Sequence, residues 1–303
     1  MFGIATIEET AGFYKNGVPF SGVPIPFSTR QWEYPWTFQV MQRFGLRPAA
    51  KLLDVGCAMN PFMIGLAGMG FFVVGLDLYA QSDPRNPYPE FGGFDPSLAN
   101  DHLSFCEADV TEKIPFDNDF FDCVYCISVL EHLTEQVGPS SIHFRPGLRP
   151  ARRLKNRAVG ALARVGLRDT FRDFVNMIDT GRRREPARDK PRSAEELQRN
   201  AVLEMLRVVR PGGLLTITMD YIPSPIKTSN SLSGVLQPCR RKMDYDFRNV
   251  VAVAQERLAD RNVHIPSDEE VSQMRDEGLL LLCATVAPRE FYHFTSVGFA
   301  FIK

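Results

Sequence analysis

The chain has 303 residues, of which 44% are hydrophobic and 23% are charged, and its formal net charge at pH 7 is −1. These values are ordinary for a soluble globular protein, and the balanced charge gives no overall affinity for nucleic acid or for a membrane surface. No apolar run approaches the ~18 residues that a membrane-spanning helix needs. The start, MFGIATIEETAGFYKNG, lacks the features of a secretory signal. We therefore expect a cytoplasmic protein whose six scattered cysteines are reduced.

Short apolar runs alternate along the chain with helical patterns, which is typical of a parallel sheet with helices on both faces. Ser193 and the glutamates that follow it predict a helix start, and the run Arg210–Gly213 predicts its end just before a strand. The expected strands are 51–55, 72–76, 103–107, 121–126 and 213–219, and the expected helices between them are 60–69, 84–99 and 194–209.

The last part of the chain breaks this pattern. Residues 279–286 and 296–302 are strand-like, and the loop between them is too short for a crossover helix. These two strands should therefore pair antiparallel. The sequence predicts one α/β domain over residues 1–303, with five parallel strands followed by a terminal antiparallel pair.

Two long segments interrupt the predicted sheet. Residues 136–192 hold 15 Lys/Arg against 5 Asp/Glu, a charge of +10, so the rest of the chain carries −11. Within them, residues 151–165 have the pattern of a basic amphipathic helix. The second segment, 222–278, contains a Pro/Ser-rich loop and a helix near 245–260.

The basic insertion allows three interpretations. It can be a helical lid, with its arginines solvated or paired to the acidic remainder of the chain. It can recognise an anionic acceptor, or contact a membrane surface peripherally through residues 151–165. Nucleic acid is disfavoured, because the charge is local and no ladder of stacking aromatic residues accompanies it.

A ligand-binding turn is predicted by the run LLDVGCAMNP at residues 52–61, where a buried strand passes through a tight turn into a helix. The next strand ends in a carboxylate, Asp77, which can accept both hydroxyls of a ribose. Together these features can bind a nucleoside. Ala58 and Asn60 stand where glycines are usual. We expect both to be tolerated, since alanine adds one methyl and asparagine accepts a left-handed backbone.

Cys123 and Cys126 form a C-x-x-C pair, but they lie in a predicted core strand. Residues three apart on a strand point to opposite faces and cannot grip one ion together. We interpret both as structural.

The order of these signals resembles one family, the class I S-adenosylmethionine-dependent methyltransferases in their small-molecule branch. The resemblance covers roughly residues 30–135 and 194–303. It implies a Rossmann-like three-layer sandwich whose seven-stranded, mostly parallel sheet has its last strand antiparallel, with the cofactor at the carboxyl ends of the strands. It rests on LLDVGCAMNPF, VVGLDLY, FCEADVTEKIPF, FDCVYCISVLEHL, RVVRPGGLLTITMD and FTSVGFAFIK.

The resemblance also implies which residues bind S-adenosylmethionine. The turn from Asp54 through Gly56 to Ala58 would cradle its methionine part, Asp77 and Leu78 would hold the ribose, and Asp109 and Val110 would flank the adenine. Ser128 and Val129 would lie near the sulfonium. The N-terminal segment 1–45 would act as a cap, with Arg30 and Tyr34 closing over the methionine end. Each acid has a plainer alternative, because Asp54 or Asp109 can support a turn and Asp77 can be an exposed loop residue.

The candidates for removing a proton from the acceptor lie just beyond the fourth and fifth strands. Glu131 and His132 follow the fourth strand, and Asp220 and Tyr221 end the fifth. His132 is the first candidate, because histidine titrates near neutrality, although the pair Glu131-His132 also resembles a structural pair in the family. His143 and His293 are further candidates. Asp220 could hold a divalent cation with Glu131 or His132, but no ligand spacing demands one, and we expect no metal.

The predicted activity is O-methylation of a small-molecule or saccharide acceptor, with an anionic or lipid-linked glycan among the candidates and a role in saccharide biosynthesis. Two alternatives stay open. One is N- or C-methylation of a small metabolite. The other is a regulatory protein that keeps the cofactor fold without turnover, which the altered glycine turn would favour.

Overall fold

The computed structural model describes residues 1–15, 29–83, 86, 93–133, 192–221, 247–258, 265–287 and 290–303. The basic stretch 151–165, and the insertion 136–192 apart from Arg192, therefore lie outside the described residues. No helix in the described part is long and apolar enough to cross a bilayer.

The strands are β1 (Phe2–Ile4), β2 (Lys51–Val55), β3 (Phe72–Asp77), β4 (Leu103–Glu107), β5 (Phe121–Ile127), β6 (Val209–Tyr221), β7 (Cys283–Ala287) and β8 (Glu290–Ile302). The helices are α1 (Ile7–Lys15), α2 (Arg30–Arg43), α3 (Pro61–Gly68), α6 (Ala194–Val208), α7 (Phe247–Arg257) and α8 (Asp268–Asp276), with short 3₁₀ turns η1 (Pro96–Leu98) and η2 (Leu130–His132).

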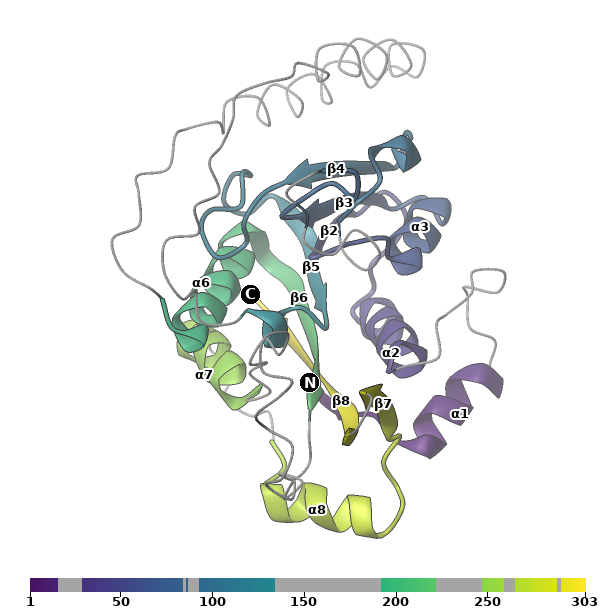
Figure 1. Cartoon of the computed structure of the whole chain (residues 1–303). Coiled ribbons are helices and arrows are strands. Elements are labelled where there is room, and N and C mark those ends of the chain that lie inside the picture. Colours follow the sequence, from purple (N-terminus) through teal and green to yellow (C-terminus); the bar gives the residue numbers. More distant parts are fainter. Residues whose placement is uncertain are drawn as a thin grey trace.

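The central sheet runs in the order β1-β8-β6-β5-β2-β3-β4 (Figure 1). Strands β6, β5, β2, β3 and β4 pair parallel, and β8 runs antiparallel to β6. The predicted seven-stranded sheet with an antiparallel last strand is confirmed. The carboxyl ends of the parallel strands meet at one edge, which is where ligands bind in open α/β sheets.

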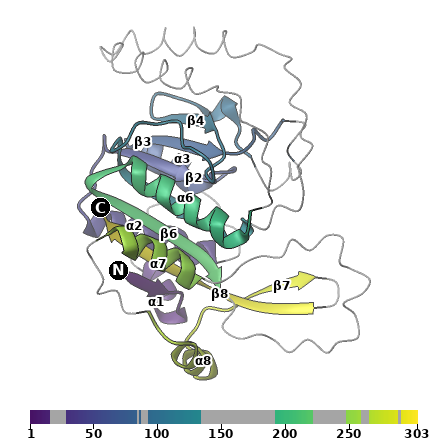
Figure 2. The ribbon, with the colours of Figure 1, turned by 90° about the vertical axis from the view of Figure 1, so that its left-hand side faces the viewer.

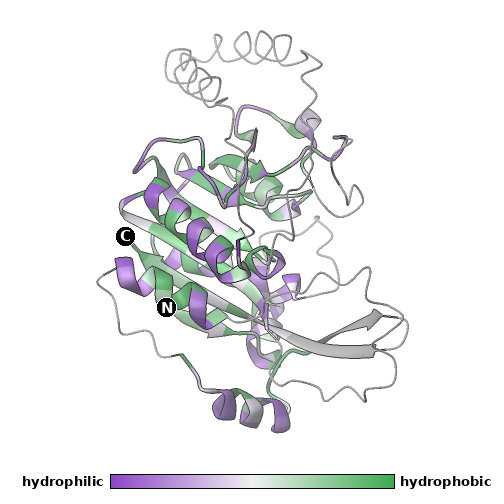
Figure 3. Cartoon of the chain, turned by 60° about the vertical axis from the view of Figure 1, so that its left-hand side comes forward, coloured by the Kyte–Doolittle hydropathy of each residue, from purple (hydrophilic) through white to green (hydrophobic). Residues whose placement is uncertain are grey.

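Helices cover both faces of this sheet (Figure 2). On one face α6 and α7 pack over a core that includes Leu53, Val124 and Leu215. On the other face α2 and α3 pack over a core that includes Leu52 and Tyr125. Figure 3 shows the same division, with hydrophobic strands inside and hydrophilic residues on the outer sides of α6 and α7. The alternation of neighbouring residues between the two cores is the period of two that a strand imposes.

Local signals fix the helices that matter for the site. Asn60 caps α3, because its side-chain oxygen accepts from the backbone N–H of Phe62, and Pro61 occupies the first helical position. Ser193 caps α6 by accepting from the N–H of Glu196, as predicted. The chain then enters β6 at Val209.

Two expectations need correction, and one is extended. The edge of the sheet next to β8 is filled by β1 from the N-terminal segment, whereas β7 pairs only with the first half of β8, in a hairpin beyond the main sheet. The predicted helix 84–99 is wrong over its described residues, where only the turn η1 is helical, because the segment is rich in proline and Asp95 caps that turn. The segment 222–278 contains α8 as well as the expected helix near 245–260, which is α7.

The two central cysteines behave as expected of structural residues. Cys123 belongs to the core under α2 and α3, and Cys126 belongs to the core under α6 and α7. Both side chains are fully buried and free of disulfides. Burial raises the pKa of both thiols well above its ordinary value, so they remain protonated.

Candidate functional site

The turn after β2 is built on two residues with left-handed backbones. Gly56 has φ +71°, and a Cβ placed there would lie 2.4 Å from Cγ2 of Val129. Only glycine fits this contact. Ala58 also has positive φ, at +41°, which costs alanine conformational energy. Asn60, by contrast, is extended with φ −72°, so its place in the turn does not depend on a left-handed backbone. Its role is to cap α3 and to donate from Nδ2 to Asp54 Oδ2 at 3.2 Å.

Asp77 ties this turn to the end of β3. Its Oδ2 accepts from the N–H of Ala58 at 2.9 Å, and its Oδ1 accepts from the N–H of Leu78 at 2.7 Å. Burial raises the pKa of Asp77, and the backbone N–H groups oppose the rise. A carboxylate has about four acceptor positions, so both oxygens can still accept from ligand hydroxyls. Leu78, with 44% of its surface exposed, provides an apolar wall beside them.

Asp54 lies beneath the turn and is almost completely buried, with 1% exposure. Its Oδ1 makes no hydrogen bond of good geometry within the described part of the chain. Burial raises the pKa of Asp54 well above its ordinary range; the nearby Tyr125 hydroxyl opposes this and Asp77 adds to it. A buried carboxyl oxygen without a partner is costly, and a positively charged ligand group at this turn would offset that cost.

The loop after β4 holds a chain of hydrogen bonds from Arg192 through Thr111 to Asp109, which we call the relay. Asp109 Oδ1 accepts from both the N–H and the hydroxyl of Thr111, at 2.8 and 2.6 Å. Arg192 in turn donates to the Thr111 hydroxyl at 3.0 Å and to Glu112 at 2.6 Å. Val110 beside them is buried. Asp109 thus supports its own turn, which was its plainer alternative, while the relay fixes the direction of its carboxyl group.

A third group gathers where α2 begins and β5 and β6 end. Arg30 donates to Glu33 and to the Ser128 hydroxyl. The Ser128 hydroxyl donates to Glu33 Oε1 at 2.7 Å and lies 3.5 Å from Asp220 Oδ1. Ser128 itself has φ +48°, a strained backbone held by its N–H to the carbonyl of Thr218. The fold therefore brings predicted residues from three distant parts of the chain into contact.

Asp220 receives two further hydrogen bonds on the same oxygen, from the hydroxyl of Thr29 at 3.1 Å and from that of Ser296 at 3.3 Å. Burial raises its pKa to about 7 and Glu33 adds to the rise, while Arg30 and the two hydroxyls oppose it. Asp220 is therefore poised to exchange a proton near neutral pH.

Glu131 lies next to this group in the turn η2 and is fully buried. Its Oε1 accepts from the N–H of Asp220 at 3.1 Å. Its Oε2 has no hydrogen-bond partner among the described residues. Burial raises the pKa of Glu131 well above the usual value, and repulsion from Asp220 raises it further.

Tyr34, the other predicted residue of α2, is also buried and stacks on Phe62 of α3 with ring centroids 5.3 Å apart. Burial raises the pKa of its hydroxyl, and Arg30 opposes this rise through a hydrogen bond and its charge. Tyr34 therefore lies between Arg30 and the helix α3 that follows the turn after β2.

Other predicted residues lie elsewhere. His132 is exposed at the end of η2. Tyr221 points to the opposite face of the sheet from Asp220, where its hydroxyl donates to Asp268 at 2.9 Å and its ring packs on Phe247. His143 lies outside the described residues, and for His293 only the backbone, in β8, is described.

Three residues of this group were missed by sequence reasoning. Glu33 carries the clearest signal, because it is a lone acid between buried aromatic residues in the run RQWEYPW. Thr29 and Ser296 carry none, since they are ordinary hydroxyl residues that only the fold brings together.

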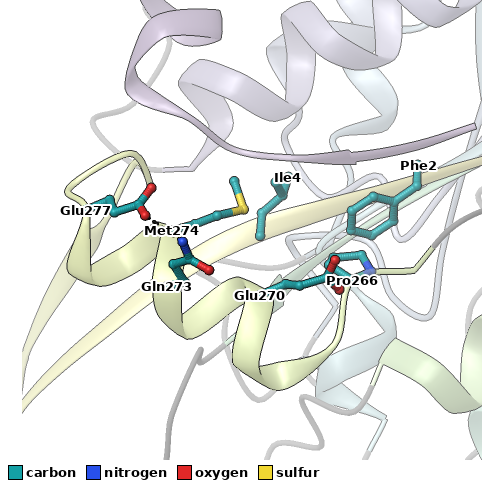
Figure 4. Close-up of a pocket in the computed structure, with 7 residues that line it drawn as sticks. All are labelled: Phe2, Ile4, Pro266, Glu270, Gln273, Met274 and Glu277. Carbon is teal, nitrogen blue, oxygen red and sulfur yellow. Dashed lines mark hydrogen bonds between the residues drawn. The ribbon is translucent and has the colours of Figure 1, made fainter.

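A cavity of about 430 Å³ lies at the sheet edge, between β1 and α8 (Figure 4). Its wall combines Phe2, Ile4 and Met274 with a hydrogen bond between Gln273 and Glu277. It contains none of the predicted site residues. Within the described residues, no three His, Cys, Asp or Glu side chains lie close enough together to hold a metal ion.

Comparison with known proteins agrees with this geometry. Residues 30–137 match the family model described as a methyltransferase domain. No curated protein matches the sequence.

Solved structures with similar folds include three that align with most of this chain. One is the Haemonchus contortus phosphoethanolamine N-methyltransferase 2 in complex with S-adenosyl-L-methionine, at 14% identity and TM-score 0.44; the alignment covers 97% of this chain and 57% of that one. Another is the N-methyltransferase NodS from Bradyrhizobium japonicum WM9, at 11% identity and TM-score 0.40, covering 95% and 99%. A third is the [4+2]-cyclase SpnF, at 12% and 0.40, covering 91% and 85%.

The sheet order and the strand-end turn with its carboxylate define a Rossmann-like α/β protein. The methyltransferase domain that matches residues 30–137 makes this chain a methyltransferase that uses S-adenosylmethionine.

Proposed function

We propose that the chain methylates a small-molecule acceptor at an oxygen or nitrogen atom that carries a proton, and that Asp220 removes this proton. The observation that supports the proposal is a carboxyl group with a pKa of about 7 at the carboxyl end of β6, 3.5 Å from the Ser128 hydroxyl. General bases work best when their pKa lies near the working pH.

The described residues fit the cofactor at the strand ends. Asp77 would accept the ribose hydroxyls, Leu78 would cover the adenosine, and Asp109 and Val110 would flank the adenine. The turn through Gly56 and Ala58, with the unpaired oxygen of Asp54 beneath it, would hold the methionine ammonium. Arg30 and Tyr34, supported by their place at the start of α2, would lie over the same end.

S-adenosylmethionine supplies a methyl group on a sulfonium, a carbon already activated for displacement. The protein then has to align the acceptor, exclude water and take the proton. Ser128 and Val129 would border the sulfonium, since Val129 packs on the Gly56 turn and Ser128 reaches the carboxyl groups. Glu131 would hold Asp220 in place by accepting from the backbone N–H of Asp220. The exposed His132 is a second candidate for carrying the proton to solvent.

Tyr221 faces the other side of the sheet, where its hydroxyl donates to Asp268 and Arg248 also donates to Asp268. It would therefore act on the acceptor only through these two residues. A hydroxyl acceptor, including a saccharide, is consistent with the resemblance of the sequence to small-molecule methyltransferases. An anionic or lipid-linked glycan would need the basic segment 136–192, of which only Arg192 is described.

The proposal is tested by measuring S-adenosylhomocysteine release over a panel of hydroxyl and amine acceptors at pH 5.5 to 9. For any accepted substrate, kcat/KM should rise with pH to a plateau, with an apparent pKa near 7. Asp220→Asn should lower kcat by about 10²- to 10⁴-fold, the usual contribution of a general base. Asp101→Asn, the same change at an exposed loop residue, is the control. Unchanged turnover in Asp220→Asn would refute the role of Asp220.

A further inference from the structure

Among the described residues, the part of the site where α2 begins and β5 and β6 end, which we call the acceptor side, carries more negative than positive charge. Three carboxyl groups, those of Glu33, Glu131 and Asp220, interact with one another there, and Arg30 is the cation that acts on Asp220. Glu33 and Glu131 have no exposed surface. Counting only the described residues with all groups ionised, three carboxylates and one guanidinium leave a net charge of −2. We refer to these three acids as the carboxylate group.

Two oxygens of this group are not satisfied by the described residues. Glu131 Oε2 is buried and has no hydrogen-bond partner there. The hydrogen bonds that the Asp220 carboxylate accepts from Thr29 and Ser296 both end on Oδ1, and the Ser128 hydroxyl lies 3.5 Å from the same oxygen. Oδ2 of Asp220 is therefore left to accept from a ligand on the side where the residue keeps some exposure.

Buried charge of one sign is unstable unless it is paired or neutralised by protonation. The raised pKa values of Glu131 and Asp220 have this cause, because both carboxyl groups are buried and each faces another acid. A bound cation would offset the cost of this buried negative charge. It would also donate hydrogen bonds to the carboxylates, and such charge-assisted hydrogen bonds are about twice as strong as neutral ones. A hydroxyl acceptor brings no charge and leaves the imbalance in place.

We propose that the acceptor is a primary or secondary amine that binds in its protonated form against the carboxylate group, with Asp220 Oδ2 as its direct contact. This inference rests on the proposed function and names its acceptor class. An amino sugar would satisfy both this requirement and the expected saccharide.

The chemical step then balances. The bound ammonium gives one proton to the Asp220 carboxylate, which leaves a neutral amine with a lone pair. This pair forms the new N–C bond to the methyl carbon, and the electrons of the C–S bond pass to sulfur. The products are a methylated ammonium and a neutral thioether, with the proton on Asp220 passing to solvent afterwards.

The cofactor has an ammonium of its own, and the experiment must separate the two. S-adenosylhomocysteine keeps that ammonium, so a saturating concentration of it fills the methionine side and leaves only the acceptor side to respond. The probes are matched pairs of equal shape, ethylamine with ethanol and benzylamine with benzyl alcohol, at pH 7.5 and equal ionic strength. Binding is measured by thermal shift and by calorimetry.

The variants are Glu131→Gln and Asp220→Asn, which keep shape and remove charge. Glu269→Gln, at an exposed position of α8, is the matched control. Wild type and control should bind at least one amine about tenfold more tightly than its alcohol, and both site variants should lose this preference.

Equal binding of amines and alcohols, no amine binding at all, or a preference that survives both site variants would overturn the inference. A failure of the proposed function looks different, because it shows as unchanged turnover or unchanged pH dependence in Asp220→Asn whatever the acceptor class.

Discussion

Replacing Asp220 with asparagine should make the stability of the fold less dependent on pH. The pKa of Asp220 lies at about 7 in the folded protein against an ordinary value of 3.8, so the folded state holds its proton more tightly than the unfolded chain. Stability therefore falls as pH rises through this window, because the unfolded chain ionises first. At about 1.4 kcal/mol per pH unit, the gap of about three units corresponds to roughly 4 kcal/mol, of which about 2.5 kcal/mol falls between pH 5 and pH 8.

The assay is urea denaturation of wild type, Asp220→Asn and the control Asp101→Asn at pH 5, 6, 7 and 8. Wild type and control should lose stability towards pH 8, and the loss should be much smaller in Asp220→Asn, so that this variant is the most stable of the three at pH 8. Glu131 has a raised pKa of the same origin and should contribute a residual slope. Parallel pH curves for wild type and Asp220→Asn would refute the reasoning.

Three further predictions concern the cofactor side. Gly56→Ala should destabilise the fold by about 2 kcal/mol or more, since the new methyl would meet Val129 at a left-handed backbone, and an unchanged urea midpoint would contradict this. Ala58→Gly should preserve cofactor affinity and stabilise the fold by up to about 1 kcal/mol by relieving its positive φ; a clear loss of stability would count against the strain. Arg192→Ala should weaken S-adenosylmethionine binding through Thr111, by about tenfold in calorimetry, and an equal affinity would show that the relay does not orient Asp109.

Much of the sheet could be predicted because its strands are short, continuous apolar runs. Strands β2, β3 and β5 are buried on both faces, which leaves a signal in almost every residue. Strand β1 has only three half-buried residues, and its partner β8 lies at the other end of the chain. Its place at the sheet edge depends on that long-range pairing, which no local pattern contains.

The residues of the site also differ in how far the sequence predicts their place. Asp77 and Asp220 end strands, so the parallel arrangement alone places them at the edge where a ligand binds. Glu33 could be missed because its importance comes from the tertiary contact of α2 with Ser128, and its helical spacing to Arg30 reads equally well as a surface ion pair. The capping role of Asn60 does not follow from the sequence alone, because a capping side chain and a left-handed backbone are both ordinary for asparagine.

Titration of the purified protein with S-adenosylmethionine in a calorimeter tests the central claim most directly. We expect saturable one-to-one binding with a dissociation constant between about 1 µM and 1 mM, the usual range for enzyme ligands. S-adenosylhomocysteine should compete for the same site. No detectable binding at millimolar S-adenosylmethionine would contradict the assignment of the turn at Gly56 and of Asp77 as a cofactor site.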